Sequence, residues 1–210
     1  MLSIVDYRKK YQGLPVLAIP ELFLPKGIYW LKGTNGSGKS TLLKSLAGIL
    51  HFEGNVLLND EFNLKTNATA YRTRVNFAPA EPVYPDFLTE NDMVKMFTAA
   101  KSGSLKQAET YIRDMGMSSH INHELGTYSS GMLKKISLIL AFLGSPLLIL
   151  LDEPLITIDT ESLKVLYNWI KERHQGEGCS FIIASHQPLE VNDLQIASEL
   201  MANNKNIQFI

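Results

Sequence analysis

A glycine-rich stretch in the first quarter of the chain has the residue types and spacing of a phosphate-binding loop. It matches the pattern G-x-x-x-x-G-K-[ST] and consists of Gly33, Thr34, Asn35, Gly36, Ser37, Gly38, Lys39, Ser40 and Thr41. Glycines allow the backbone to curl until its N–H groups converge on phosphate oxygens, and a following helix adds its positive end. We expect Lys39 to reach the β- and γ-phosphates of a nucleotide and Ser40 to offer a hydroxyl to Mg²⁺.

Two carboxylates follow a buried strand much later in the chain. Leu147–Leu151 is a continuous apolar run, and Asp152 and Glu153 come directly after it. Ligands of open α/β sheets bind at the carboxyl edge of the strands. We therefore expect Asp152 to hold Mg²⁺ and Glu153 to act as the general base on an attacking water. An acidic strand end without function is the alternative, and the phosphate-binding loop weighs against it.

Strands and helices must alternate along the chain to position these two groups of residues. The loop lies between a strand-like run, Gly27–Lys32, and a helical pattern, Ser40–Leu50. A phosphate-binding loop requires this strand before it and this helix after it, whereas an incidental glycine turn, the alternative, does not. Further apolar runs and one further helical pattern follow the same alternation: Val75–Pro79, Leu147–Leu151, Leu163–Arg173 and Ser180–Ala184. This order predicts an α/β fold with a mostly parallel sheet.

Two other regions depart from that alternation. Ser3–Ile19 together with Asn55–Leu58 is typical of antiparallel β structure. Glu90–Met117 has the pattern of polar-faced helices with no strand between them. The sequence therefore predicts an N-terminal antiparallel β portion and an inserted helical lobe.

Composition limits the classes of protein to which this chain can belong. Its 210 residues are 45% hydrophobic, enough to bury a core, and 20 basic and 21 acidic residues give a formal net charge of -1. No overall field draws the chain to nucleic acid or anionic lipid. A single cysteine excludes an internal disulfide framework, and no apolar run reaches the roughly 20 residues of a membrane span. We expect a cytoplasmic protein.

The loop and the carboxylate strand, in this order and with helices between them, resemble the nucleotide-binding domain of ABC (ATP-binding cassette) transporters. The resemblance covers nearly the whole chain and implies one domain over residues 1–210, with a RecA-like P-loop NTPase core and a helical subdomain at about 82–130. It implies ATP and Mg²⁺ as ligands and ATP hydrolysis as the activity. It also implies a transmembrane permease as partner, which would hold this chain at the inner face of the membrane.

A second motif of that family lies before the apolar helix that leads to the carboxylate strand. Tyr128–Met132 reads YSSGM where the family has L-S-G-G-Q, so Ser129 and Gly131 match and Ser130 and Met132 do not. The resemblance implies that Ser129, Ser130 and Gly131 contact the γ-phosphate held by the loop of another subunit, in a homo- or heterodimer. A simple helix cap by one of the serines is the alternative.

Three single residues complete the predicted site by resemblance. Asp159 ends the segment at the family's D-loop position, although Asp159 or Thr160 could equally be a helix N-cap. His186 follows Phe181–Ala184, which we expect to be the last core strand, and would contact the γ-phosphate; the alternative is a solvated loop histidine. Tyr11 would stack on adenine, with Tyr7 as a competitor and an ordinary strand tyrosine as the alternative.

One element of the family pattern is missing. Ala80 stands where the family has a glutamine that contacts Mg²⁺ and the membrane partner, and the adjacent Glu81 is the candidate substitute. The following segment, Pro82–Met117, could form a groove for a partner helix, or its apolar residues could be the lobe's own core. Those apolar residues are Val83, Tyr84, Pro85, Phe87, Leu88, Met93, Val94, Met96 and Phe97.

The function that these motifs favour is an ATPase subunit of a membrane transporter. The YSSGM segment, the turn Pro79–Pro82 and the small size resemble export-type members. A soluble ABC-type ATPase of DNA maintenance or translation is one alternative, although the chain has no basic run or heptad arm. A GTPase would need an N-K-x-D motif, which is absent. A catalytically impaired subunit of a heterodimer is the remaining alternative, suggested by Ala80 and Met132.

Overall fold

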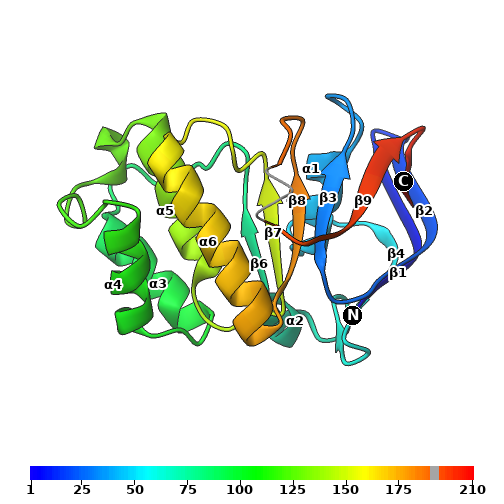
Figure 1. Cartoon of the computed structure of the whole chain (residues 1–210). Helices are drawn as coiled ribbons and strands as arrows, with labels where there is room; N and C mark the ends of the chain where they lie inside the picture. Colours follow the sequence, from blue (N-terminus) through cyan, green and yellow to red (C-terminus); the bar gives the residue numbers. More distant parts are fainter. Residues whose placement is uncertain (190–193) are drawn as a thin grey trace.

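A mostly parallel sheet forms the centre of the computed structural model, which describes residues 1–189 and 194–210 (Figure 1). Within that part of the chain the sheet has six strands in the order β10-β9-β3-β8-β7-β6. The strands are β3 (Ile28–Lys32), β6 (Val75–Ala78), β7 (Leu148–Asp152), β8 (Ser180–Ala184), β9 (Ile196–Asn203) and β10 (Asn206–Phe209). All neighbouring strands are parallel except β9 and β10. The predicted α/β fold is confirmed.

The second sheet is antiparallel and lies beside β9 at one end of the molecule (Figure 1). Its order is β2-β1-β4-β5, with β1 (Leu2–Tyr11), β2 (Leu14–Leu24), β4 (Glu53–Leu58) and β5 (Phe62–Asn63). The predicted antiparallel portion is confirmed, and β2 continues five residues beyond the expected end at Ile19.

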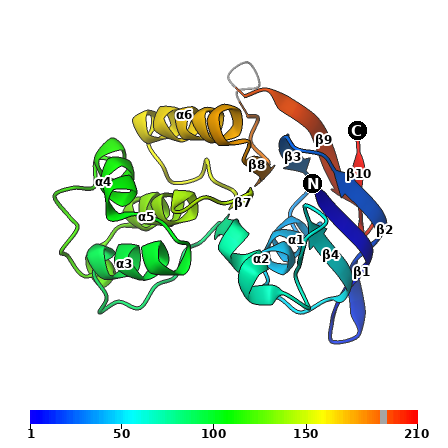
Figure 2. The same ribbon diagram turned by 90° about the horizontal axis from the view of Figure 1, so that it is seen from below.

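Helices cover both faces of the parallel sheet and also form a separate layer beyond its β6 edge. Figure 2 shows α6 on one face and α1 and α2 on the other, whereas α5 packs against β6 and β7, and α3 and α4 lie beyond α5, away from the strands. Their bounds are α1 (Lys39–Leu46), α2 (Ala68–Arg74), α3 (Glu90–Ala100), α4 (Leu105–Asp114), the 3₁₀ turn η1 (Leu125–Thr127), α5 (Ser130–Phe142) and α6 (Thr160–Glu177). The region Glu90–Met117 is helical with no strand in it, as predicted. No described helix combines the length and the hydrophobicity that a bilayer crossing requires.

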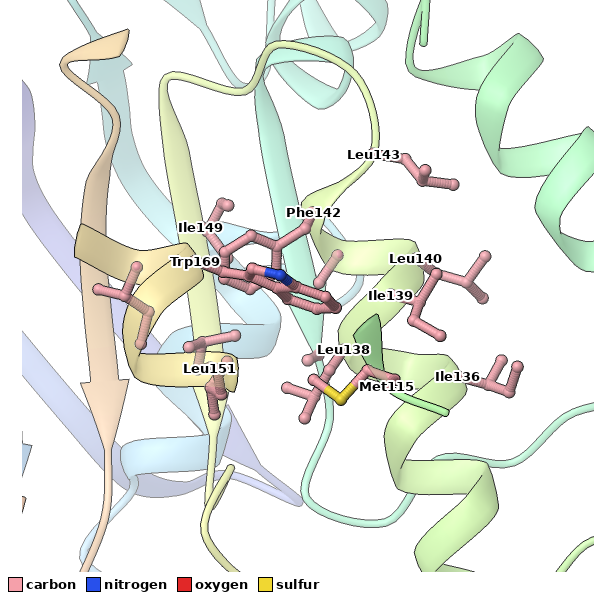
Figure 3. Packing of buried hydrophobic residues seen from close by; sticks show 14 of the residues in the cluster. Met115, Ile136, Leu138, Ile139, Leu140, Phe142, Leu143, Ile149, Leu151 and Trp169 are labelled. Atoms are coloured by element: carbon pink, nitrogen blue, oxygen red, sulfur yellow. The ribbon is translucent and has the colours of Figure 1, made fainter. Parts of the chain in front are cut away.

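Strand β7 is fixed from both sides by alternating apolar side chains. Ile149 and Leu151 pack in one cluster with Phe142 of α5 and Trp169 of α6, whose rings lie 5.2 Å apart (Figure 3). Leu148 and Leu150 face the opposite cluster, which contains the leucines of α1. Because every residue of β7 is buried, the position of its carboxyl end is determined by packing on both faces.

The expectation that Phe181–Ala184 is the last core strand is wrong. Strand β9 follows it and pairs in parallel with β3, and β10 then returns antiparallel to β9. The turn between them consists of Asn204 and Lys205, which have φ angles of 48° and 62°. Two consecutive left-handed residues match the twist of a two-residue hairpin, so this pair extends the sheet beyond β3.

Candidate nucleotide-binding site

The glycine-rich loop connects β3 to α1, as its sequence pattern requires. Gly36 and Gly38 have φ angles of 78° and 99°, which side chains rarely adopt, and a Cβ atom at Gly38 would lie 2.8 Å from Leu17. The Lys39 ammonium is folded back over the loop and donates to the carbonyl oxygens of Gly33, at 2.7 Å, and Thr34, at 3.2 Å. The loop therefore holds its own lysine at the place where phosphates would lie.

A cavity of about 500 Å³, called here the phosphate cavity, opens over this loop. Its lining residues come from three separate segments: Tyr11, Val16, Asn35, Gly36, Ser37, Gly38, Lys39, Ser40, Thr41 and Glu153. Tyr11 is 45% exposed at the end of β1. Its competitor Tyr7 is fully buried, with its hydroxyl donating to Ser45 at 2.8 Å, so only Tyr11 of the two faces the cavity.

Asp152 ends β7 with its carboxylate almost completely buried. Burial raises the pKa of Asp152, whereas the hydroxyl of Ser40 acts in the opposite direction. Its Oδ1 atom has no hydrogen-bond partner among the described residues. A buried carboxylate oxygen beside a serine hydroxyl is a partial oxygen ligand set, and Mg²⁺ typically completes such a set with water and nucleotide phosphates. The residues present therefore fit Mg²⁺ bound together with a nucleotide.

Glu153 and His186 lie together at the neighbouring ends of β7 and β8. The backbone N–H of Glu153 donates to the carbonyl of Ala184 at 2.8 Å, and Glu153 Oε2 lies 3.0 Å from His186 Nδ1. Glu153 has a φ angle of 45°, a strained conformation for a glutamate. Glu153 lines the phosphate cavity and His186 does not, so the structure places His186 beside the site through its contact with Glu153.

The two serines of the YSSGM segment are exposed, Tyr128 is buried, and none of the five residues lines the phosphate cavity. Ser129 is the N-cap of α5, and its Oγ accepts a hydrogen bond from the backbone N–H of Met132 at 3.3 Å. Ser129 and Ser130 are otherwise exposed. A Cβ atom at Gly131 would lie 2.8 Å from the carbonyl oxygen of Thr157. The helix-cap alternative holds for Ser129, and the segment does not reach the loop of its own chain.

Asp159 has a structural role in this chain. It is the N-cap of α6, so Thr160 is not, and its Oδ1 accepts from the backbone N–H of Ser162 at 2.8 Å. The Lys135 ammonium lies 2.7 Å from Asp159 Oδ2. The hydrogen bond from Lys135, and then that from Ser162, hold the pKa of Asp159 well below its usual range. Asp159 thereby joins α5 to α6 next to the YSSGM residues.

A second cavity, the apolar groove, has a volume of about 550 Å³ and lies between α1, β6, α3 and α5. It is lined by Lys44, Ala47, Ile49, Val75, Asn76, Phe77, Pro79, Glu81, Val83, Tyr84, Phe97, Lys101, Ser137, Leu140 and Ala141. Glu81 therefore faces the groove and not the phosphate cavity. The apolar residues considered for a partner groove lie in three kinds of place. Val83, Tyr84 and Phe97 line it, Met93 and Val94 are buried in the lobe, and Phe87 and Met96 are exposed outside the groove.

Sequence reasoning missed one buried charged residue near the site. Lys134 in α5 is fully buried and donates to the carbonyl oxygens of Pro79, Ala80 and Asp152. The sequence does indicate its burial, because Lys134 lies four residues before Leu138 and therefore on the same buried face of the helix. A lysine on the apolar face of a helix needs buried acceptors.

Known proteins of similar sequence align with most of this chain. Residues 23–156 match the family model described as ABC transporter. Over 193 residues the chain is 30% identical to the cytochrome c biogenesis ATP-binding export protein CcmA of Legionella pneumophila (strain Lens), covering 91% of this chain and 96% of that protein. It is 27% identical over 192 residues to the ABC-type transporter ATP-binding protein EcsA of Bacillus subtilis (strain 168), covering 89% and 77% of the two chains.

Solved structures share the fold at lower identity. The ATP-binding subunit of an ABC transporter superposes with a TM-score of 0.88 at 21% identity, covering 100% of this chain and 90% of that one. A dimeric ATP-binding cassette in a post-hydrolysis state, bound to ADP and Pi, superposes with a TM-score of 0.84 at 17% identity, covering 99% and 97%.

Proposed function

This chain belongs to the ABC transporter family and is an ATP-binding ATPase, and on that premise we propose that it powers an export-type transmembrane permease. The permease would hold the chain at the inner face of the membrane. Export rather than import is supported by the relative CcmA, which is described as an ATP-binding export protein. The apolar groove is the surface that we assign to the permease, because its wall carries Val83 and Tyr84 beside the nucleotide-binding half of the molecule.

The contact between Glu153 and His186 at the phosphate cavity carries the proposal of hydrolysis. Glu153 accepts a proton from the attacking water as general base, and His186 orients that water beside the γ-phosphate. Lys39 binds the β- and γ-phosphates and Tyr11 stacks on adenine. Ser40 and Asp152 would hold Mg²⁺, which supplies positive charge to the phosphate oxygens when it is bound.

A second copy or a related chain completes the site. Ser129, Ser130 and Gly131 would donate their hydroxyl and backbone N–H groups to the γ-phosphate on the partner's loop. Two observations support this arrangement: both serines are exposed, and the segment lies outside its own chain's phosphate cavity. A head-to-tail dimer with two nucleotides in its interface satisfies both.

Phosphate release from Mg²⁺-ATP by the purified chain and by Glu153→Gln tests the proposal. The variant should lose at least about 100-fold in rate while still binding ATP, because it removes the base and keeps the shape. Glu109→Gln is the matched control, since Glu109 is an exposed glutamate of α4 that lines neither cavity, and it should keep the wild-type rate. Equal rates for wild type and Glu153→Gln would show that Glu153 is not the base. A wild type without phosphate release would instead indicate an impaired subunit.

A further inference from the structure

Lys134 is the one fully buried lysine described in this chain, and all of its donors are used. Its Nζ atom lies 2.8 Å from the carbonyl oxygen of Pro79, 3.2 Å from that of Ala80 and 3.0 Å from that of Asp152. An ammonium group has three donors and no acceptor, so three carbonyl oxygens satisfy it completely.

The three acceptors belong to the carboxyl ends of two neighbouring strands. β6 and β7 pair in parallel, and Ala78 opposite Leu151 is the last pair in their register. Pro79, Ala80 and Asp152 come directly after that pair, where no further pairing joins the two segments. Lys134 therefore replaces the sheet's hydrogen bonds at the point where the strands separate.

Those two segments lead to different surfaces. Pro79 forms part of the wall of the apolar groove, and Asp152 precedes Glu153, which lines the phosphate cavity. Ala80 contributes only its carbonyl to this arrangement. One side chain thus connects the groove wall to the peptide from which the proposed base extends.

The electrostatic surroundings agree with this geometry. Burial lowers the pKa of Lys134 to about 8, while the carboxylates of Asp152 and Glu153 act in the opposite direction. The buried cation is therefore placed beside the two carboxylates of the site, although it bonds only to backbone oxygens. An apolar side chain of similar volume would fill the same space but leave three carbonyl oxygens without their donor.

We propose that Lys134 is a positioning residue for ATP hydrolysis. By donating to the carbonyl oxygen of Asp152 and to those of Pro79 and Ala80, it links the end of β7 to the segment after β6 and so fixes the direction in which Glu153 leaves β7. This inference rests on the proposed function of Glu153. It adds a route, through one buried side chain, by which a displacement of the groove wall reaches the base.

Arg173 in α6 provides a matched control because it is a second buried cation that bonds to backbone carbonyl oxygens. Its Nη2 atom donates to the carbonyl oxygen of Phe142 and, at 2.9 Å, to that of Gly144. It lines neither the apolar groove nor the phosphate cavity. Arg173 thus shares the chemistry of Lys134 without contacting the β7 end.

The experiment compares Lys134→Met and Arg173→Met in the full chain, measuring kcat for phosphate release, the Kd for ATP in a Glu153→Gln background, and the thermal unfolding midpoint. Lys134→Met should lower kcat at least tenfold and leave the Kd within about threefold. Arg173→Met should lower the midpoint but keep kcat within about threefold. Wild-type kcat in Lys134→Met, or an equal loss of kcat in both variants, would overturn the proposal.

Lys134→Gln keeps the test decisive if the methionine variant does not fold. A glutamine amide has two N–H donors, so at least one of the three carbonyls stays unpaired, and kcat should fall at unchanged Kd. A folded Lys134→Gln chain with wild-type kcat would also overturn the proposal. If Glu153→Gln itself retains hydrolysis, the proposed function fails; if Glu153→Gln is inactive and Lys134→Met is not, only the role of Lys134 fails.

Discussion

The phosphate cavity and the YSSGM segment are organised in opposite ways. In the cavity, Tyr11, the loop and Glu153 come from three distant segments and converge on one space. In the YSSGM segment, Ser129 bonds to its own helix and the serine side chains are otherwise exposed. One region is therefore assembled within the chain to receive a ligand, while the serines of the other begin a helix and are exposed. This difference is the reason to expect that the complete site needs two chains.

The largest effect should follow from removing the charge at the centre of the assembled region. Lys39→Ala should weaken ATP binding at least about 100-fold, because it removes the buried ammonium group that lies over the loop and would bind the phosphates. Isothermal titration of the chain with Mg²⁺-ATP measures this change. Lys44→Ala is the control on the same helix, since Lys44 lines the apolar groove, and it should bind ATP within about threefold of wild type. Equal affinities for both variants would show that the cavity does not bind the phosphates.

A smaller and more selective effect should follow from disturbing the outward-facing region. Gly131→Ala places a Cβ atom 2.8 Å from the carbonyl oxygen of Thr157, so α5 and the loop before α6 must separate. Hydrolysis should fall about tenfold, while ATP binding to the single chain stays unchanged. Gly176→Ala in α6 is the control, because a Cβ atom there meets nothing within 4 Å. Loss of ATP binding in Gly131→Ala would contradict the separation of the two regions.

The smallest effect concerns the helical lobe that carries the YSSGM segment. Glu90 is fully buried and its Oε2 accepts from the Tyr128 hydroxyl at 2.9 Å. Burial raises the pKa of Glu90 from its ordinary 4.5 to about 7, against the opposing hydrogen bond. Between these values the folded chain binds a proton that the unfolded chain releases, so the free energy of unfolding falls as pH rises and levels off above about 7.

Glu90→Gln should remove that dependence on pH. Between pH 5 and pH 8, wild type should lose about 1 to 2 kcal/mol more than the variant in chemical denaturation. Glu109→Gln, at an exposed carboxylate of the same lobe, should behave as wild type. Parallel pH profiles for wild type and Glu90→Gln would show that Glu90 is not held in its protonated form.

Local patterns were enough to predict the elements that carry the site. The loop could be placed between a strand and a helix because its glycines and lysine are contiguous, and β7 because its apolar run is uninterrupted. The hairpin after β9 was also readable, since alternating residues flank a polar turn at Asn204 and Lys205, but it was missed.

Contacts between distant segments could not be read in the same way. Glu153 contacts His186 because β7 pairs with β8 and places Asp152 opposite Ala184. The sequence of neither segment predicts which strands are neighbours in the sheet. Lys134 bonds to carbonyls 55, 54 and 18 residues away, and backbone acceptors have no sequence signature. Packing of α5 on the sheet alone brings them together.

Activity in a mixture of two impaired chains tests most directly whether the site is shared between chains. Lys39→Ala lacks a working loop but keeps its YSSGM segment, and Gly131→Ala has the reverse defect. In an equal mixture with Mg²⁺-ATP, half of the dimers contain one intact site, so phosphate release should approach about a quarter of the wild-type rate. A mixture no more active than the sum of its two separate chains would contradict the account.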